Sequence, residues 1–193
     1  SKSPRYTYTN ALCMAGNGCS NTTYDTIVVS IPLLTVSTDS NVLCNGQSNG
    51  GASVATSNTQ GTVTYAWSNG ATANFITGVA AGTYTVTISD ASGCTNSGST
   101  TVMEPTVLVA ATVTDGNVSC YSISDGVATA SATGGTTPYT YAWPSGTTTA
   151  NETGLSQGSY VVTVSDANGC TSTSSVSITQ PTTLNSSVAS IFS

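Results

Sequence analysis

Apolar and polar residues alternate over short stretches of this chain of 193 residues. In Thr64–Trp67, for example, Tyr65 and Trp67 fall on the same face of an extended segment. Two longer stripes show the same period of two, and they comprise Tyr84, Val86 and Ile88, and Tyr160, Val162 and Val164. Turn dipeptides separate the stripes: Asn49-Gly50, Asn69-Gly70, Asp125-Gly126 and Asn168-Gly169. The pattern predicts short β-strands joined by tight turns.

The pattern repeats after 76 residues without a gap. The anchors that recur at this offset are Cys44 and Cys120, Trp67 and Trp143, Asp90 and Asp166, Cys94 and Cys170, and Pro105 and Pro181. We therefore expect two complete modules, at residues 32–104 and 105–180. Residues 1–31 match the end of a module and residues 181–193 match the start of one, so we interpret the chain as a window on a longer tandem array.

About seven short strands in roughly 75 residues, with regular turns, are typical of a small immunoglobulin-like β-sandwich. The sequence thus predicts an all-β fold of tandem sandwich modules. A core of this size is close to the lower limit for independent stability. That limit suggests a structural role for the six cysteines.

We expect one disulfide in each module, Cys44–Cys94 and Cys120–Cys170, and a third bridge, Cys13–Cys19, in the N-terminal segment. Each bridge within a module would contribute about 4 kcal/mol in the chain-entropy model. Three disulfides would imply an oxidising, extracytoplasmic compartment. Free buried thiols are the alternative.

Charge is scarce, and its scarcity excludes several functions. The chain has 2 Lys or Arg, 8 Asp or Glu and no His. The only cations are Lys2 and Arg5, so there is no basic groove for nucleic acid. A Ser–His or Cys–His catalytic pair also needs a histidine. No apolar run is long enough to cross a membrane as a helix. We therefore expect no enzyme, no nucleic-acid partner and no membrane insertion in this segment.

The residues from Cys44 to Pro105 include Cys-Asn-Gly, Asn-Gly-Gly-Ala, Tyr-Ala-Trp-Ser-Asn-Gly, Ala-Gly-Thr-Tyr-Thr-Val-Thr-Ile-Ser-Asp-Ala-Ser-Gly-Cys and Glu-Pro. This pattern resembles the SprB repeat of the large gliding-motility adhesins of Bacteroidetes. The second copy departs from it where Tyr121 follows Cys120 and Pro144 follows Trp143. Residues 1–31 look more like the end of a PKD-like or immunoglobulin-like domain. The resemblance implies type IX secretion and display on the cell surface or in an extracellular fibre, and it implies no catalysis.

Asp90 and Asp166 lie in Ser-Asp-Ala-Xaa-Gly-Cys segments. One interpretation is a calcium ligand, and the other is an Asx turn that positions the following cysteine. We favour the turn, because no cluster of neighbouring acidic residues supplies further ligands. We therefore expect no cofactor, with calcium as the alternative.

The aromatic residues have two interpretations as well. Trp67 and Trp143 could form an exposed platform for sugars, but packing in the core is favoured, as in immunoglobulin domains. Tyr84 and Tyr160 are interpreted in the same way. Thr26, in Asp25-Thr26-Ile27, resembles the acceptor of a Bacteroidetes O-glycosylation site, and an ordinary strand is the alternative.

These features predict a non-catalytic stalk or fibre segment of a surface adhesin, in which modules contact mainly their neighbours in the same chain. One alternative is a filament subunit that pairs strands with identical chains, because the strand edges lack protective charge. The other is a carbohydrate-binding module that contacts surface polysaccharide.

Overall fold

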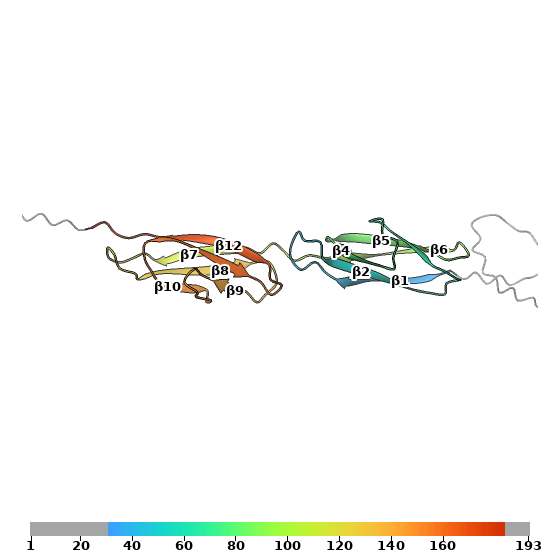
Figure 1. The fold of residues 1–193 in the computed structure, drawn as a ribbon, viewed down its shortest axis with the longest axis horizontal. Coiled ribbons are helices and arrows are strands. Elements are labelled where there is room, and N and C mark those ends of the chain that lie inside the picture. The colour runs from blue at the N-terminus through green and yellow to red at the C-terminus, as the bar shows by residue number, and fades with distance from the viewer. Residues whose placement is uncertain (1–30, 184–193) are drawn as a thin grey trace, which may run out of the picture. The chain divides into compact units, whose positions relative to one another are not determined.

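The computed structural model describes residues 31–183. All the secondary-structure elements in this range are β-strands, with no helix among them. The chain divides into two compact units, Ser1–Glu104 (unit 1) and Pro105–Ser193 (unit 2). The strands of unit 1 are β1 (Leu33–Ser40), β2 (Gly50–Ser57), β3 (Thr64–Trp67), β4 (Phe75–Val79), β5 (Gly82–Ser89) and β6 (Thr95–Val102). Those of unit 2 are β7 (Val109–Gly116), β8 (Gly126–Thr133), β9 (Thr140–Ala142), β10 (Asn151–Leu155), β11 (Gly158–Ser165) and β12 (Thr171–Ile178) (Figure 1).

Each unit is a sandwich of two three-stranded antiparallel sheets. The sheets of unit 1 have the orders β1-β2-β4 and β3-β5-β6, and those of unit 2 have the orders β10-β8-β7 and β12-β11-β9. Equivalent strands begin 76 residues apart, and only β9 ends earlier than its counterpart β3. The prediction of tandem all-β sandwiches is therefore confirmed, with six strands in each unit rather than about seven.

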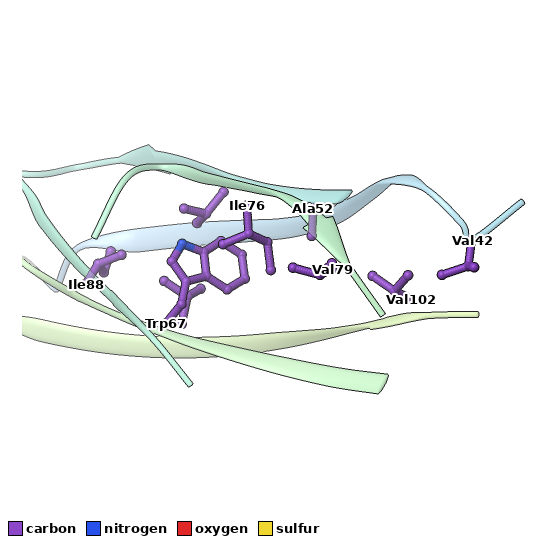
Figure 2. Close-up of a cluster of buried hydrophobic side chains, with 9 residues drawn as sticks. Val42, Ala52, Trp67, Ile76, Val79, Ile88 and Val102 are labelled. Atoms are coloured by element: carbon purple, nitrogen blue, oxygen red, sulfur yellow. The ribbon is translucent and has the colours of Figure 1, made fainter. Parts of the chain in front are cut away.

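The alternating pattern places the core between the two sheets. Along β5, Val86 and Ile88 are buried while Thr85 and Thr87 are exposed. In unit 1, Trp67 of β3 points toward Ile76 of β4 in the opposite sheet (Figure 2). In the core of unit 2, Trp143, Leu155 and Ile178 lie at the positions equivalent to Trp67, Val79 and Val102. Burial of these apolar side chains provides the main driving force for folding each unit.

The two sheets meet along one side, where the first strand of each unit lies against the last. In unit 1, the Thr38 hydroxyl lies 2.8 Å from the Thr100 hydroxyl and donates to the Thr101 carbonyl oxygen at 3.1 Å. In unit 2, the Thr112 hydroxyl donates to the Ser175 carbonyl oxygen at 2.9 Å. Hydrogen bonds from side chains thus join these two edges, which belong to different sheets.

Gly50 and Gly126 begin the second strand of each unit because no side chain fits there. A Cβ atom on Gly50 would lie 2.4 Å from Val102 Cγ1, and one on Gly126 would lie 2.8 Å from Ile178 Cγ2. Val102 and Ile178 are themselves buried at the end of the last strand. Glycine therefore lets β2 and β8 approach the opposite sheet closely.

One core position differs sharply between the units. Ile76 of β4 is 3% exposed, and its counterpart on β10 is Glu152, which is 4% exposed. The Glu152 Oε2 atom is buried and has no hydrogen-bond partner among the described residues. The apolar core of unit 2 therefore contains a polar atom that lacks the hydrogen bond with which buried polar groups are normally stabilised.

The disulfides predicted within each module are wrong. In space, Cys44 lies near the C-terminal end of β6, close to Met103 and Glu104. Cys94 directly precedes the first residue of β6, at the other end of the strand. Eight strand residues separate these two ends by roughly 25 Å, and a disulfide needs Cα atoms within about 7 Å. In unit 2, Cys120 is a free, exposed thiol, so it does not bridge to Cys170. Cys44, Cys94 and Cys170 are nevertheless disulfide-bonded.

We predict that Glu152→Ile stabilises unit 2 by about 1–3 kcal/mol, because it removes a buried polar group that lacks a partner. The measurement is chemical denaturation followed by tryptophan fluorescence in a Trp67→Phe background, where Trp143 reports on unit 2 alone. The matched control, Ile76→Glu, should destabilise unit 1 when Trp67 is the reporter. An unchanged or lower midpoint for Glu152→Ile would contradict this account of the core.

Candidate functional site

Asp90 organises the loop between β5 and β6. Its Oδ1 atom accepts hydrogen bonds from the backbone N–H groups of Ser92 at 2.9 Å and Cys94 at 3.0 Å. Its Oδ2 atom accepts a third from the N–H group of Gln60 at 3.1 Å, in the loop between β2 and β3. The carboxylate thus forms an Asx turn that fixes Cys94 and also joins two loops at one end of the unit.

Asp166 repeats this arrangement in unit 2. Its carboxylate accepts from the N–H groups of Asn168, Cys170 and Thr136, each at 2.9 Å. Burial opposes ionisation of the carboxyl, but these N–H donors outweigh it and hold the pKa of Asp166 below its usual value. The ionised form is therefore the one that organises the loop.

Asp90 and Asp166 lie apart from other candidate metal ligands in the described part of the chain. Among residues 31–183, no three His, Cys, Asp or Glu side chains gather where a metal ion could be held. Both oxygens of Asp90 and of Asp166 already accept backbone N–H groups. Calcium at Asp90 or Asp166 stays an untested alternative.

The two tryptophans are buried, each with 4% of its surface exposed. The indole N–H of Trp67 donates to the Ala73 carbonyl oxygen at 2.9 Å, and that of Trp143 donates to the Thr149 carbonyl oxygen at 3.0 Å. Both rings pack in the core and both polar atoms are satisfied. Trp67 and Trp143 therefore offer no exposed platform to a sugar.

Tyr84 and Tyr160 are half-buried at the edge of the core and fix a turn with their hydroxyl groups. Tyr84 donates to the Ala80 carbonyl oxygen and Tyr160 to the Ser156 carbonyl oxygen, both at 3.0 Å. Each bond reaches back four residues, as in the tyrosine corner of immunoglobulin-like sandwiches. The sequence pattern identified the apolar part of this role but not the hydrogen bond.

A second loop, at the opposite end of each unit, holds Cys44 or Cys120. In unit 1, Asn49 Oδ1 accepts from the N–H of Leu43 at 3.0 Å, and Glu104 Oε2 accepts from the N–H of Gly46 at 2.6 Å. The sequence pattern marks the Asn49-Gly50 turn beside this loop but not the loop itself.

The corresponding loop of unit 2 uses the same kinds of bond. Asp125 Oδ1 accepts from the N–H of Ser119 at 2.9 Å, and Gln180 Oε1 accepts from the N–H of Ser122 at 3.2 Å. Hydrogen bonds from the Ser119 hydroxyl and N–H hold the pKa of Asp125 below its usual value. Gln180 replaces Glu104 here because the loop needs an acceptor oxygen, which either side chain supplies.

Three residues singled out in the sequence, Cys13, Cys19 and Thr26, lie outside the described residues. The described part of the chain contains no helix long and apolar enough to span a membrane.

Comparison with known families finds the SprB repeat at two places, residues 36–72 and 111–148. One of the two matches lies in each unit. The first match runs from within β1 to just after β3, and the second runs from within β7 to the loop after β9. The matches therefore cover the first half of each sandwich, including its buried tryptophan, and the resemblance seen in the sequence is confirmed.

Three solved structures are among those similar to this chain. A C-terminal 282-residue fragment of intimin, solved with the intimin-binding domain of its translocated receptor, aligns over 76% of this chain and 64% of its own, with 14% identity and a TM-score of 0.41. Domains 4–9 of the surface layer protein SbsC align over 80% of this chain and 31% of their own, with 15% identity and a TM-score of 0.28.

The fibronectin(III)-like modules of CbhA from Clostridium thermocellum align over 76% of this chain and 94% of their own, with 14% identity and a TM-score of 0.30. This chain thus spans less than two thirds of the intimin fragment and of the SbsC fragment. A comparison with curated proteins finds no match.

We predict that Asp166→Asn destabilises unit 2 at neutral pH. Because folding lowers the pKa of Asp166, its ionisation stabilises the fold above the unfolded-state pKa of about 3.9, and this contribution is lost as the pH falls through the lower folded-state pKa. The stability difference between the parent chain and the variant should therefore narrow below about pH 4.

Denaturant midpoints measured from pH 7 to pH 2.5 test this prediction. Asp115→Asn is the control, because Asp115 is exposed and lies outside this loop. A difference between the parent chain and Asp166→Asn that is constant across the whole range would show that the charge of Asp166 does not matter to the loop.

Proposed function

We propose that this chain is a non-catalytic structural segment, a stalk or fibre, of a bacterial surface adhesin. The SprB repeats and the recurrence of one sandwich support a structural repeat protein at the cell surface. Secretion by the type IX route, a Bacteroidetes source, a role in gliding motility and a glycan on Thr26 belong to the same proposal and rest on the resemblance.

The proposal is supported by a comparison of equivalent residues in the two units. The shared residues are structural: Trp67 and Trp143, Tyr84 and Tyr160, and the aspartates of the two Asx turns. Most of the large exposed apolar side chains are not shared, and the exceptions are Ile31 with Val107 and Leu33 with Val109, at the start of each unit. Phe75 is replaced by Asn151, Leu43 by Ser119, and Tyr121 occupies the position of Asn45. A recognition site needed in every module would keep its exposed residues.

The carbohydrate-binding alternative has less support, because both tryptophans are buried. The filament alternative requires a strand edge that accepts a second chain. The edges β1 and β6 cover one another, and the remaining edges of unit 1 are short, with four residues in β3 and five in β4. Short edge strands are a known protection against intermolecular pairing.

We predict that unit 2 can be exchanged but not simply removed. In the parent adhesin, replacing residues 105–180 with a second copy of residues 29–104 keeps the length and the sandwich fold while changing many exposed side chains. A spacer should keep wild-type adhesion after this exchange. In-frame deletion of residues 105–180 should shorten the reach and reduce adhesion, because one module is lost.

Adhesion of cells that carry each variant is the measurement, with surface display confirmed by antibody labelling. If the exchange abolishes adhesion as fully as the deletion does, unit 2 carries a recognition site and the spacer proposal is wrong. Adhesion unchanged by the deletion would also contradict a need for reach.

A further inference from the structure

The outward face of the sheet β1-β2-β4 in unit 1 carries an exposed aromatic side chain (Figure 1). Phe75 begins β4 and is 52% exposed, whereas the next residue, Ile76, is buried in the core. Ser53 of β2 is the strand partner of both Phe75 and Ser37 of β1. Since directly opposed residues of antiparallel strands share a face, Ser37, Ser53 and Phe75 form one row across the three strands.

A carboxylate lies beside this row because β1 contains a bulge. The register between β1 and β2 shifts between Thr38 and Ser40, so Asp39 is the extra residue of the bulge. Bulges often redirect a side chain toward a functional position. Here Asp39 Oδ1 accepts a hydrogen bond from the Ser53 hydroxyl at 2.7 Å. The bulge thus holds the carboxylate next to the residue that pairs with Phe75.

The polar groups of the row have capacity left for a ligand. Among residues 31–183, the Ser53 hydroxyl is the only hydrogen-bond donor to the Asp39 carboxylate, and it binds Oδ1. Oδ2 is therefore available to accept strong, charge-assisted hydrogen bonds from hydroxyl donors. Ser37 is exposed, with its Oγ atom 3.3 Å from Ser53 Oγ, and a hydroxyl group both donates and accepts.

The charge of unit 1 limits the chemistry of such a ligand. Residues 31–104 contain the acidic residues Asp39, Asp90 and Glu104 and no Lys or Arg. An anionic ligand would be repelled by Asp39 and would find no cation in these residues to bind it. A purely cationic ligand would use the carboxylate but not the acceptor needs of the two serine hydroxyls. A neutral ligand with many hydroxyl groups matches both kinds of polar group.

We propose that this face of unit 1 binds a neutral polysaccharide. One sugar ring lies with its C–H face on the Phe75 ring, which removes apolar surface of both partners from water. Hydroxyl groups of the sugar donate to Asp39 Oδ2 and exchange hydrogen bonds with Ser37. An apolar platform with a few polar groups at its side is the usual composition of a small-molecule site. The site goes beyond the stalk function, and the buried tryptophans take no part in it.

Unit 2 keeps the acidic pair but lacks the aromatic platform. The Thr129 hydroxyl donates to Asp115, which occupies the equivalent bulge of β7. Asn151 stands in the place of Phe75, and its Oδ1 atom lies 3.1 Å from Thr129 Oγ1. The sugar ring would have no apolar surface to cover there. We therefore expect one binding site in this chain, in unit 1.

NMR titration of the full, ¹⁵N-labelled chain with neutral oligosaccharides tests the site. The probes are cellotetraose, laminaritetraose and mannotetraose, with tetragalacturonic acid as the acidic control and spermine as the cationic control. At least one neutral probe should cause saturable shifts of the Ser37, Ser53 and Phe75 amide signals, without shifts in unit 2. The absence of saturable shifts with all three neutral probes would overturn the proposal. So would shifts centred elsewhere, or binding of either charged control at this face as tight as that of the neutral probes.

Three variants test the role of each group. Phe75→Asn introduces the residue of unit 2 and should abolish detectable binding, and Asp39→Asn should weaken binding by about tenfold because a charge-assisted bond is lost. Leu43→Ser is the matched control, since it also replaces an exposed apolar residue by its counterpart in unit 2 and should leave the affinity unchanged. Denaturation midpoints confirm that each variant is folded. Parent-like binding by folded Phe75→Asn, or equal losses in Phe75→Asn and Leu43→Ser, would show that Phe75 is not the platform.

Discussion

Each unit depends on the way a single tryptophan is held between its two sheets. Trp67 ends β3, and the chain then turns back and crosses to the opposite sheet as β4. The indole N–H bonds the Ala73 carbonyl oxygen, and the backbone N–H bonds the Ala71 carbonyl oxygen at 2.9 Å. The ring therefore fills the core and fixes the crossing between sheets at the same time. Trp143 does the same in unit 2 through Thr149 and Thr147.

Much of this architecture could be predicted from the sequence. The alternation around Trp67 and Ile88 identified strands and core positions, because a strand buries every second side chain. The 76-residue offset identified the duplication without any structural information. The same offset places Glu152 opposite Ile76, so the unusual core position of unit 2 could also have been found by comparing the two copies.

The pairing of the cysteines could not be predicted in the same way. With two cysteines in each copy, the 76-residue spacing is the same whether or not the two cysteines of a copy bond to each other. Only the fold shows that Cys44 and Cys94 lie at opposite ends of β6. The hydrogen bonds of the Tyr84 and Tyr160 hydroxyl groups could not be predicted for a related reason. Their acceptors are backbone carbonyl oxygens, which every residue type has.

Four of the seven acidic side chains among the described residues bind the backbone. Asp90, Asp166, Asp125 and Glu104 each accept backbone N–H groups in loops at the ends of the units. The only two cations of the chain, Lys2 and Arg5, precede the described residues. Charge in these loops therefore stabilises turns through hydrogen bonds, and such short-range bonds depend less on salt than exposed ion pairs do.

The closure between the first and last strands also determines how a unit responds to tension. The strands β1 and β6 run in the same direction, because residue numbers increase along both in their mutual contacts. These contacts join Pro32 to Asn96, Thr38 to Thr100 and Asn41 to Met103. Tension applied through the two ends of the unit therefore pulls these strands past each other in shear. All the bonds along their length then bear the load together instead of opening one after another.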